Sequence, residues 1–442
     1  MPTPEQESPK PSLFSSASRF ICSLFDRLIS STWISFVLIF MLSIWNHFNE
    51  LRKIPLRYLI PTAHWELGSI AISLMETGQF ANPYMIVTGP TAHLPPIYPW
   101  IVSLIYRWFG LTDTAGTVSF IFILITGSLL LASLPFFSAK MGLGRAAGFL
   151  GGLYGASIVV WPGHGEYLTG LILAVVLIIF LRRWTSNNTT QTGSILLGAA
   201  IGISFHLQPA LLPVMVGCLV FEFWWKRKDN KKWLVVLIVL GITLVSIPWG
   251  WRNYKTFNSI FFIRSNFGLE LRMGNHDGAV PTMVEMDSLG EEHHHPRSHY
   301  GDAKKLRDLG EIEYMHNAGQ EAMDWIQTNP GEFLWLSIRR FANIWAGPHY
   351  DPSAAVRVST LTFLAIMGAW ISFPILLTPQ RFSLLIPLAT YPFIYYFMAY
   401  MPRYRIPIDW ILYLLAGFYI SHIINRGWDF MKTILLKSNI RE

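Results

Sequence analysis

Charged residues and cysteines are both scarce in this chain. Only 14% of its 442 residues are charged and 52% are apolar, whereas a soluble domain carries about 25% charged residues. This composition excludes an ordinary soluble protein. Cysteine occurs only at positions 22 and 218, so a disulfide framework is not indicated. No glycine-rich nucleotide-binding loop appears. No fixed-period repeat is visible either, so a solenoid is not expected.

Long apolar stretches dominate what remains. Stretches of about 17–25 residues with almost no charge are long enough to cross a hydrocarbon core ~30 Å thick. The sequence therefore predicts an all-α, multi-pass membrane protein. We expect about ten membrane helices near residues 31–47, 115–137, 143–162, 166–182, 193–205, 207–225, 233–249, 355–377, 382–400 and 408–425.

Basic residues indicate how these helices are oriented. Five basic clusters lie near residues 19–27, 140–145, 182–183, 226–232 and 426–437, and the positive-inside rule places such clusters in the cytoplasm. The net charge of +7 is thereby explained by topology, and no nucleic-acid partner is expected. All five clusters share one side only if the apolar piece 95–110 lies along or dips into the outer leaflet. The alternative is that segment 95–110 spans the membrane and one of the other apolar segments does not.

This topology divides the chain into four parts. Residues 1–30 form a polar, partly disordered tail, and 31–249 form a membrane domain whose first outer loop covers 48–114. Residues 250–354 form an outer subdomain, expected to be largely helical. The last part, 355–442, contains the C-terminal membrane helices and a short cytoplasmic tail. The first outer loop, the outer subdomain and a short turn before the last helix would share one outer face.

An amphipathic stretch over residues 66–77 follows the first membrane segment. Apolar residues recur there at helical spacing, and Glu66 and Glu76 lie on the opposite face. One interpretation is that Glu66 is a solvated carboxylate on an interfacial helix. The other is that Glu66 is a general base, held near the membrane surface where a lipid headgroup can reach it.

Four later segments favour the second interpretation through their order and spacing. They are GPTAHLPPIYPWIVSLIYRWFG (89–110), IPWGWRNYKTFNSIFFIRSNFGLELRMGNHDGA (247–279), AMDWIQTNPGEFLWLSIRRFANIWAGP (322–348) and MPRYRIPIDWILYLLAGF (401–418). Together they resemble the GT-C superfamily of polyprenol-phosphate-sugar-dependent glycosyltransferases. The similarity is greatest to bacterial members related to protein O-mannosyltransferases and aminoarabinose transferases, and it runs over about residues 30–425.

The resemblance implies a catalytic base in the first outer loop. In the family this base is acidic and often belongs to an Asp-Glu pair, but the matching pair here is Trp65 and Glu66, so Glu66 alone would serve. The HLPP stretch matches the family's Pro-Pro motif at the end of this loop. His93 in that stretch, and also His64, could hydrogen-bond a sugar or phosphate, or each could simply be solvated.

Arginines in the RYR motif suit the phosphate of a lipid-linked donor. The guanidinium groups of Arg403 and Arg405 can each donate two parallel hydrogen bonds to phosphate oxygens, although arginines at a helix end also snorkel to lipid headgroups. Glu166 is a further site candidate at the outer end of a helix, or a helix N-terminal charge. Three more polar residues could add to the phosphate cluster: Arg252, Arg272 and Asn275.

A run of three histidines at 293–295 invites a metal interpretation. Consecutive residues of one regular element do not converge on a single ion, and zinc ligands are spaced differently. We therefore expect neither a metal nor another cofactor.

The resemblance implies an inverting glycosyltransferase in the bacterial inner membrane, with its site facing the periplasm. A monosaccharide on a polyprenyl phosphate would be the donor, Glu66 would deprotonate an acceptor hydroxyl, and Arg403 and Arg405 would stabilise the departing lipid phosphate. The sequence does not identify the sugar or the acceptor. Two alternatives remain: a transporter or flippase for lipid-linked sugars, which would need broken or charged mid-membrane segments that are scarce here, and an O-antigen ligase-like or polymerase-like enzyme.

Overall fold

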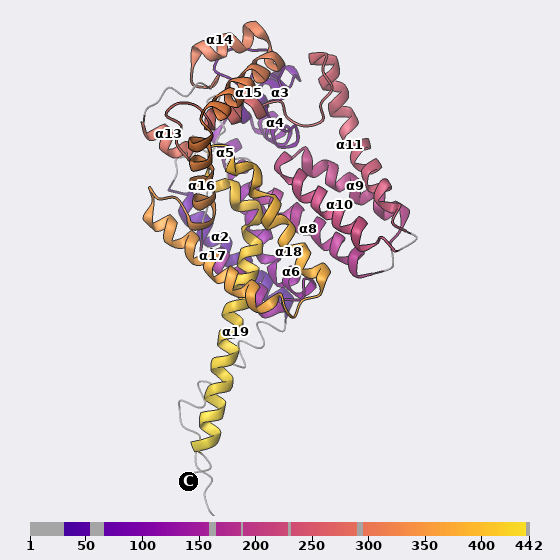
Figure 1. Ribbon diagram of the computed structural model, residues 1–442, viewed down its shortest axis with the longest axis vertical. Helices are drawn as coiled ribbons and strands as arrows, with labels where there is room; N and C mark the ends of the chain where they lie inside the picture. Colours follow the sequence, from indigo (N-terminus) through magenta and orange to yellow (C-terminus); the bar gives the residue numbers. More distant parts are fainter. Residues whose placement is uncertain are drawn as a thin grey trace, which may run out of the picture.

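The computed structural model describes residues 31–53, 66–158, 165–186, 189–228, 231–289 and 295–438. Regular structure in these ranges is helical, with two isolated β-bridges, Ala81 to Pro90 and Thr282 to Tyr400. The expected all-α class is confirmed. In Figure 1 most of the long helices lie in the middle and lower part of the view, and several shorter helices lie at the top.

The apolar helices form a membrane domain. Five segments of the described chain are long and apolar enough to cross a membrane: Asp113–Lys140, Glu166–Thr185, Leu234–Phe257, Pro352–Ser372 and Pro402–Gly427. The protein is thus a multi-pass membrane protein. Its helices are α2 (Thr32–Leu51), α5 (Asp113–Ala132), α6 (Leu134–Lys140), α7 (Arg145–Ala156), α8 (Glu166–Thr185), α9 (Gln191–Phe205), α10 (Leu212–Trp225), α11 (Leu234–Phe257), α17 (Pro352–Ser372), α18 (Thr378–Thr390) and α19 (Ile406–Ser438).

Two of these helices differ clearly from the expected boundaries. α11 continues to Phe257, so the helix is not interrupted at residue 250, where the outer subdomain was expected to begin. The helix expected at 382–400 ends at Thr390 and is followed by a 3₁₀ turn, η3 (Pro392–Tyr396). Pro392 begins this turn and has no N–H to donate to a further α-helical hydrogen bond. The 13 residues of α18 extend only about 20 Å, less than a ~30 Å core. The count of ten membrane helices is therefore not confirmed.

α19 is held in the membrane domain by close backbone contacts with α7 and α17. Gly417 of α19 faces the backbone of α7, and Gly368 of α17 faces the carbonyl group of Leu415. A Cβ atom at either glycine would collide with that backbone, so small residues permit the close approach. This packing holds α19 in place. The turn η4 (Pro402–Arg405) directly precedes the first residue of α19.

The other helices come from residues 66–109 and 250–354 (Figure 1), and we call them the short helices because none of them is both long and apolar enough to cross a membrane. They are α3 (Glu66–Thr77), α4 (Ile97–Phe109), α12 (Phe267–Gly274), α13 (Met283–Leu289), α14 (Tyr300–Leu309), α15 (Glu311–Thr328) and α16 (Pro330–Ala346). α15 gives way to α16 at the junction of Asn329 and Pro330, because a proline disfavours helical backbone in the residue before it. α3 packs on α4, and α12 packs on α15.

α4 covers most of the segment 95–110. Its 13 residues extend about 20 Å, which is too short to cross the hydrocarbon core. Tyr98 and Tyr106 are buried on one face, whereas Trp100 and Trp108 are exposed. Exposed tryptophans on an amphipathic helix are typical of a membrane surface, which agrees with a helix that does not cross.

Candidate active site

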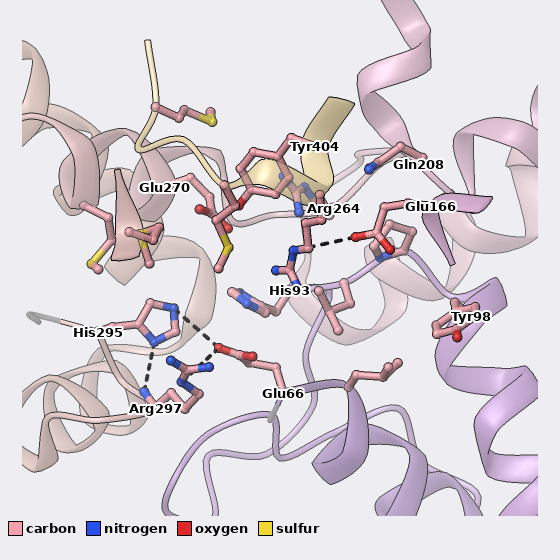
Figure 2. Close-up of a pocket in the computed structure, with 18 of the residues that line it drawn as sticks. Glu66, His93, Tyr98, Glu166, Gln208, Arg264, Glu270, His295, Arg297 and Tyr404 are labelled. Carbon is pink, nitrogen blue, oxygen red and sulfur yellow. Dashed lines mark hydrogen bonds and ion pairs between the residues drawn. The ribbon is translucent and has the colours of Figure 1, made fainter. Parts of the chain in front are cut away.

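A cavity of about 150 Å³ lies where the short helices meet the membrane helices (Figure 2). Segments far apart in the sequence line it: α3, the loop before α4, the first turn of α8, the turns around Arg264 and His295, and the turn η4. Four residues expected from the sequence line this cavity: Glu66, His93, Glu166 and Arg403. His64 lies outside the described residues.

Glu66 is the first residue of α3 and is buried, with 9% of its surface exposed. Its Oε1 lies 3.7 Å from Nε2 of His295 and 3.7 Å from Nε of Arg297. Glu76 lies on the same helix and is exposed. Glu66 is therefore not a solvated residue of α3, because the segment around residue 295 covers it and leaves it facing the cavity.

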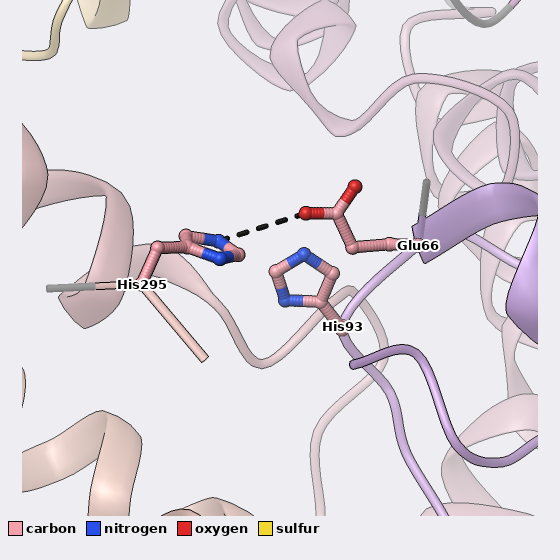
Figure 3. A group of neighbouring side chains, drawn as sticks. All are labelled: Glu66, His93 and His295. Atoms are coloured by element: carbon pink, nitrogen blue, oxygen red, sulfur yellow. Dashed lines mark ion pairs between the residues drawn. The ribbon is translucent and has the colours of Figure 1, made fainter. Parts of the chain in front are cut away.

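His93 is buried in the loop before α4, with 3% of its surface exposed. Its Nδ1 lies 2.9 Å from the hydroxyl oxygen of Tyr84, and its backbone N–H donates to Oγ1 of Thr91 at 3.0 Å. These contacts fix the imidazole ring beside Glu66 and His295 (Figure 3). The interpretation of His93 as a solvated loop residue is wrong.

Arg252 supports this loop from behind and does not line the cavity. Its guanidinium group donates to the carbonyl oxygens of Thr91 at 2.7 Å and Phe80 at 2.9 Å. It also lies over the ring of Trp249, 5.0 Å from the centroid. Because its donors are used on backbone carbonyls, the structure places Arg252 in the support of the loop and away from the expected phosphate cluster.

Glu311, which the sequence analysis did not single out, supports the same loop. Its Oε1 accepts hydrogen bonds from the backbone N–H of Ala92 at 2.7 Å and from Oγ of Ser265 at 2.6 Å. Burial raises the pKa of Glu311, and these hydrogen bonds oppose the rise. A single glutamate at the start of a helix carries no sequence signal for this role, because its partner lies 219 positions away.

Glu166 and Arg403 face one another in another part of the cavity. Glu166 is the first residue of α8 and is 4% exposed, and its Oε1 lies 3.6 Å from Nε of Arg403. Arg264 and Gln208 line the cavity close to this pair, and Figure 2 shows Glu66 on a different wall. The lining thus carries several groups of both signs: the carboxylates are Glu66, Glu166, Glu270 and Asp287, and the arginines are Arg264, Arg297 and Arg403.

Arg405 lies two residues after Arg403 but faces away from this cavity. Its Nε lies 2.6 Å from Oδ1 of Asp409, and its guanidinium group donates to the carbonyl oxygen of Ile344 at 2.8 Å. The structure therefore corrects the expectation that both arginines face one phosphate, because the tight turn η4 sends their side chains in different directions.

Arg272 and Asn275 also lie outside the cavity lining. Arg272 pairs with Asp302 at 3.3 Å and with Glu321 at 3.0 Å. Asn275 donates to the carbonyl oxygen of Phe397 at 2.8 Å. Both residues hold the short helices together, so the expected larger cluster around the phosphate is not assembled.

Glu66, His93 and His295 could hold a divalent cation, since they offer three ligand atoms that lie within 4.8 Å of one another (Figure 3). Carboxylate and imidazole groups are common zinc ligands. His295 is the member of the histidine run that the structure describes, and His293 and His294 lie outside the described residues. The guanidinium group of Arg297 lies 3.7 Å from Glu66 and would repel such a cation.

Comparison with known proteins identifies the fold. Neither a protein-family model nor a curated protein matches the chain. The oligosaccharyltransferase AglB of Archaeoglobus fulgidus matches in a complex with an inhibitory peptide and a dolichol-phosphate, with a TM-score of 0.52 and 15% identity over 89% of this chain and 50% of AglB. The apo form of the enzyme matches with a TM-score of 0.53 and 15% identity over 91% and 52%.

The chain has a GT-C-like fold. It spans about half the length of the archaeal oligosaccharyltransferase. ArnT from Cupriavidus metallidurans, solved bound to undecaprenyl phosphate, also matches, with a TM-score of 0.30 and 13% identity over 92% of this chain and 78% of ArnT. The fold expected from the sequence resemblance is confirmed by the two archaeal structures, whose TM-scores exceed 0.5.

Proposed function

We propose that this protein is an inverting membrane glycosyltransferase that transfers a monosaccharide from a polyprenyl phosphate to an acceptor hydroxyl group. The observation that carries the proposal is the meeting of Glu66 with the Glu166–Arg403 pair around one cavity of a GT-C-like fold. The dolichol-phosphate in the AglB complex supports a lipid phosphate as ligand. We place the protein in the bacterial inner membrane with this cavity on the periplasmic side.

Glu66 acts as the general base in this proposal. As the acceptor oxygen attacks the anomeric carbon, the hydroxyl proton moves to the Glu66 carboxylate and the bond between that carbon and the phosphate oxygen breaks. His295 and Arg297, each 3.7 Å from Oε1, hold the carboxylate in place. His93 beside them offers a hydrogen bond to the sugar, with its ring fixed by Tyr84.

Arg403 stabilises the negative charge that develops on the departing polyprenyl phosphate. A guanidinium group binds phosphate oxygens through parallel, charge-assisted hydrogen bonds. Glu166, 3.6 Å away, orients Arg403 toward the cavity, and Arg264 adds a further positive charge to the lining close to this pair. Arg405 has no part in this step, because it faces Asp409 and Ile344.

The proposal is tested with purified protein and radiolabelled polyprenyl-phosphate sugars. Wild type should transfer label to an acceptor, an outcome that separates an enzyme from a transporter or flippase. Glu66→Gln keeps the size of the side chain but cannot take the proton, and loss of a general base typically costs ~10²–10⁴-fold in rate. Glu76→Gln, on the exposed face of the same helix, is the matched control and should retain full activity.

Two results would overturn this proposal. One is wild-type protein that moves lipid-linked sugar across a vesicle membrane without transferring it. The other is Glu66→Gln protein with the same turnover as Glu76→Gln. The second result would also favour an O-antigen ligase-like enzyme, whose reaction need not depend on Glu66.

A further inference from the structure

A second cavity, of about 220 Å³, lies on the other side of the turn that carries Arg403. Neighbouring residues of this turn face alternate sides. Met401, Arg403 and Tyr404 line the first cavity, whereas Tyr400, Pro402 and Arg405 line the second. The wall between the two cavities is therefore a single stretch of chain.

Charges of both signs line the second cavity in equal number. Arg405 and Asp409 are both buried and form an ion pair of 2.6 Å. Asp351 and Arg357 belong to the start of α17, where Asp351 caps the helix by accepting from the N–H of Ala354 at 3.0 Å. Two cations and two anions leave the lining without net charge. A ligand that carries one charge of each sign matches such a lining.

The second cavity lies at the end of a lipid-facing helix. α17 qualifies as a membrane span, yet only 17% of its apolar window is buried within the protein, so lipid must cover most of it. Ala354, Val358 and Leu361 recur at helical spacing along one face and line the cavity. This face continues into the buried contact with α19, since Leu361 is 1% exposed. Val356, Phe363 and Ile366 are exposed on the rest of α17, which is open to acyl chains. A charged cavity at the end of such a helix is within reach of lipid headgroups.

We propose that this second cavity binds the headgroup of a zwitterionic membrane phospholipid, and that the headgroup is phosphoethanolamine. Arg357 and Arg405 contact the phosphate, because guanidinium groups are suited to its oxygens. Asp351 accepts hydrogen bonds from the primary ammonium group, which a quaternary choline cannot donate. An anionic lipid would add an unmatched negative charge to a lining that already contains Asp351 and Asp409.

Two tryptophan substitutions on α17 test the site. Val358→Trp fills the cavity that Val358 lines. Val356→Trp is the matched control, because Val356 lies two residues earlier, outside the lining, and is 65% exposed. Full-length proteins in detergent are incubated with equal amounts of phosphatidylethanolamine, phosphatidylcholine and phosphatidylglycerol with identical acyl chains. Native mass spectrometry then counts the lipids that remain bound.

Wild type and Val356→Trp should retain one phosphatidylethanolamine in preference to the other lipids, and Val358→Trp should lose it. Arg357→Gln should weaken the preference by about tenfold, a typical effect of losing one charge-assisted hydrogen bond. This variant also decides the matter if Val358→Trp does not fold, because Arg357 is exposed. Arg307→Gln, at an exposed arginine of α14, is its control.

The proposal is overturned if wild type binds the three lipids equally, or if Arg357→Gln and Val358→Trp retain phosphatidylethanolamine as well as their controls do. The assay contains no sugar donor and measures no transfer. Its result is therefore independent of whether the protein is a glycosyltransferase.

Discussion

The lining of the first cavity and the supporting layer behind it, formed by Glu311 and Arg252, both contain glutamate and arginine. These charged residues have different partners in the two regions. In the lining, Glu66 and Arg403 meet other charged side chains at 3.6–3.7 Å. In the supporting layer, Glu311 and Arg252 make short hydrogen bonds to the backbone around Thr91. Charged groups that bind backbone hold the loop in shape, whereas those that face the cavity can contact a ligand.

Glu66→Gln should have the largest effect on activity. If Glu66 belongs to the lining and not to the supporting layer, the same substitution should leave the stability of the fold almost unchanged. The cationic partners of Glu66, His295 and Arg297, lie 3.7 Å away, which is longer than a hydrogen bond, so the amide analogue removes little that holds the fold. Turnover should fall by ~10²–10⁴-fold, while the thermal unfolding midpoint stays close to that of Glu76→Gln. A large fall in the midpoint would move Glu66 into the supporting layer.

Arg403→Lys and Arg405→Lys should separate the two sides of the turn. Lysine keeps the charge and loses the planar pair of donors, and one charge-assisted hydrogen bond is worth roughly 1.5–3 kcal/mol. Arg403→Lys should therefore lower kcat/KM for the donor by about 10–100-fold. Arg405→Lys should leave donor kinetics unchanged and lower the unfolding midpoint, because its partners are Asp409 and the Ile344 carbonyl. Similar losses in donor kcat/KM for both variants would contradict this assignment.

Glu311→Ala should affect stability more than the chemistry. It leaves the buried N–H of Ala92 without its acceptor, which typically costs about 1–3 kcal/mol. The unfolding midpoint should fall, and turnover should fall less than in Glu66→Gln because the base is intact. Ser265→Ala removes only the second donor to Glu311 and is the milder control. Turnover as low as that of Glu66→Gln at an unchanged midpoint would argue against a supporting role.

Glu311 also predicts a small dependence of stability on pH. Burial raises its pKa in the folded protein, whereas the unfolded value is about 4.3. Its contribution to stability is complete below the unfolded pKa and is lost as pH rises through the folded pKa. The midpoint of wild type should therefore fall with rising pH more than that of Glu311→Gln, measured in parallel from pH 4 upward. Parallel pH profiles would show that Glu311 does not contribute.

Removal of metal ions should have the smallest effect on the reaction. Arg297 competes for Glu66 with any cation held by His93 and His295, so we expect the same transfer rate before and after treatment with a chelator. Metal content measured by mass spectrometry on the purified protein is the companion measurement. Loss of transfer that zinc or manganese restores would show that these three residues are metal ligands in the active enzyme.

The sequence predicted the fold class well because apolar length and periodicity are local properties. The same reasoning identified α3 but left open whether Glu66 faces solvent or a site, since Arg297, which lies beside it, is more than 200 positions away in the sequence. Arg403 and Arg405 looked equivalent because a motif does not show which way each side chain of a 3₁₀ turn points. The three histidines at 293–295 cannot all converge on one ion from a single regular element, yet His295 lies beside Glu66 and His93 from other segments. Long-range contacts of this kind leave no pattern in a single sequence.

The contacts around Glu66 also bear on how the protein is made. Glu66 belongs to the first part of the sequence, the residues that cover it are near position 295, and Arg403 directly precedes α19. On the ribosome these segments emerge in that order, at about 5–20 residues per second. The cavity can close only after the start of α19 has been synthesised and has packed against α7 and α17. Until then the nascent chain contains Glu66 but lacks Arg403, the residue that we propose binds the donor phosphate. A product truncated before α19 therefore cannot possess a complete site.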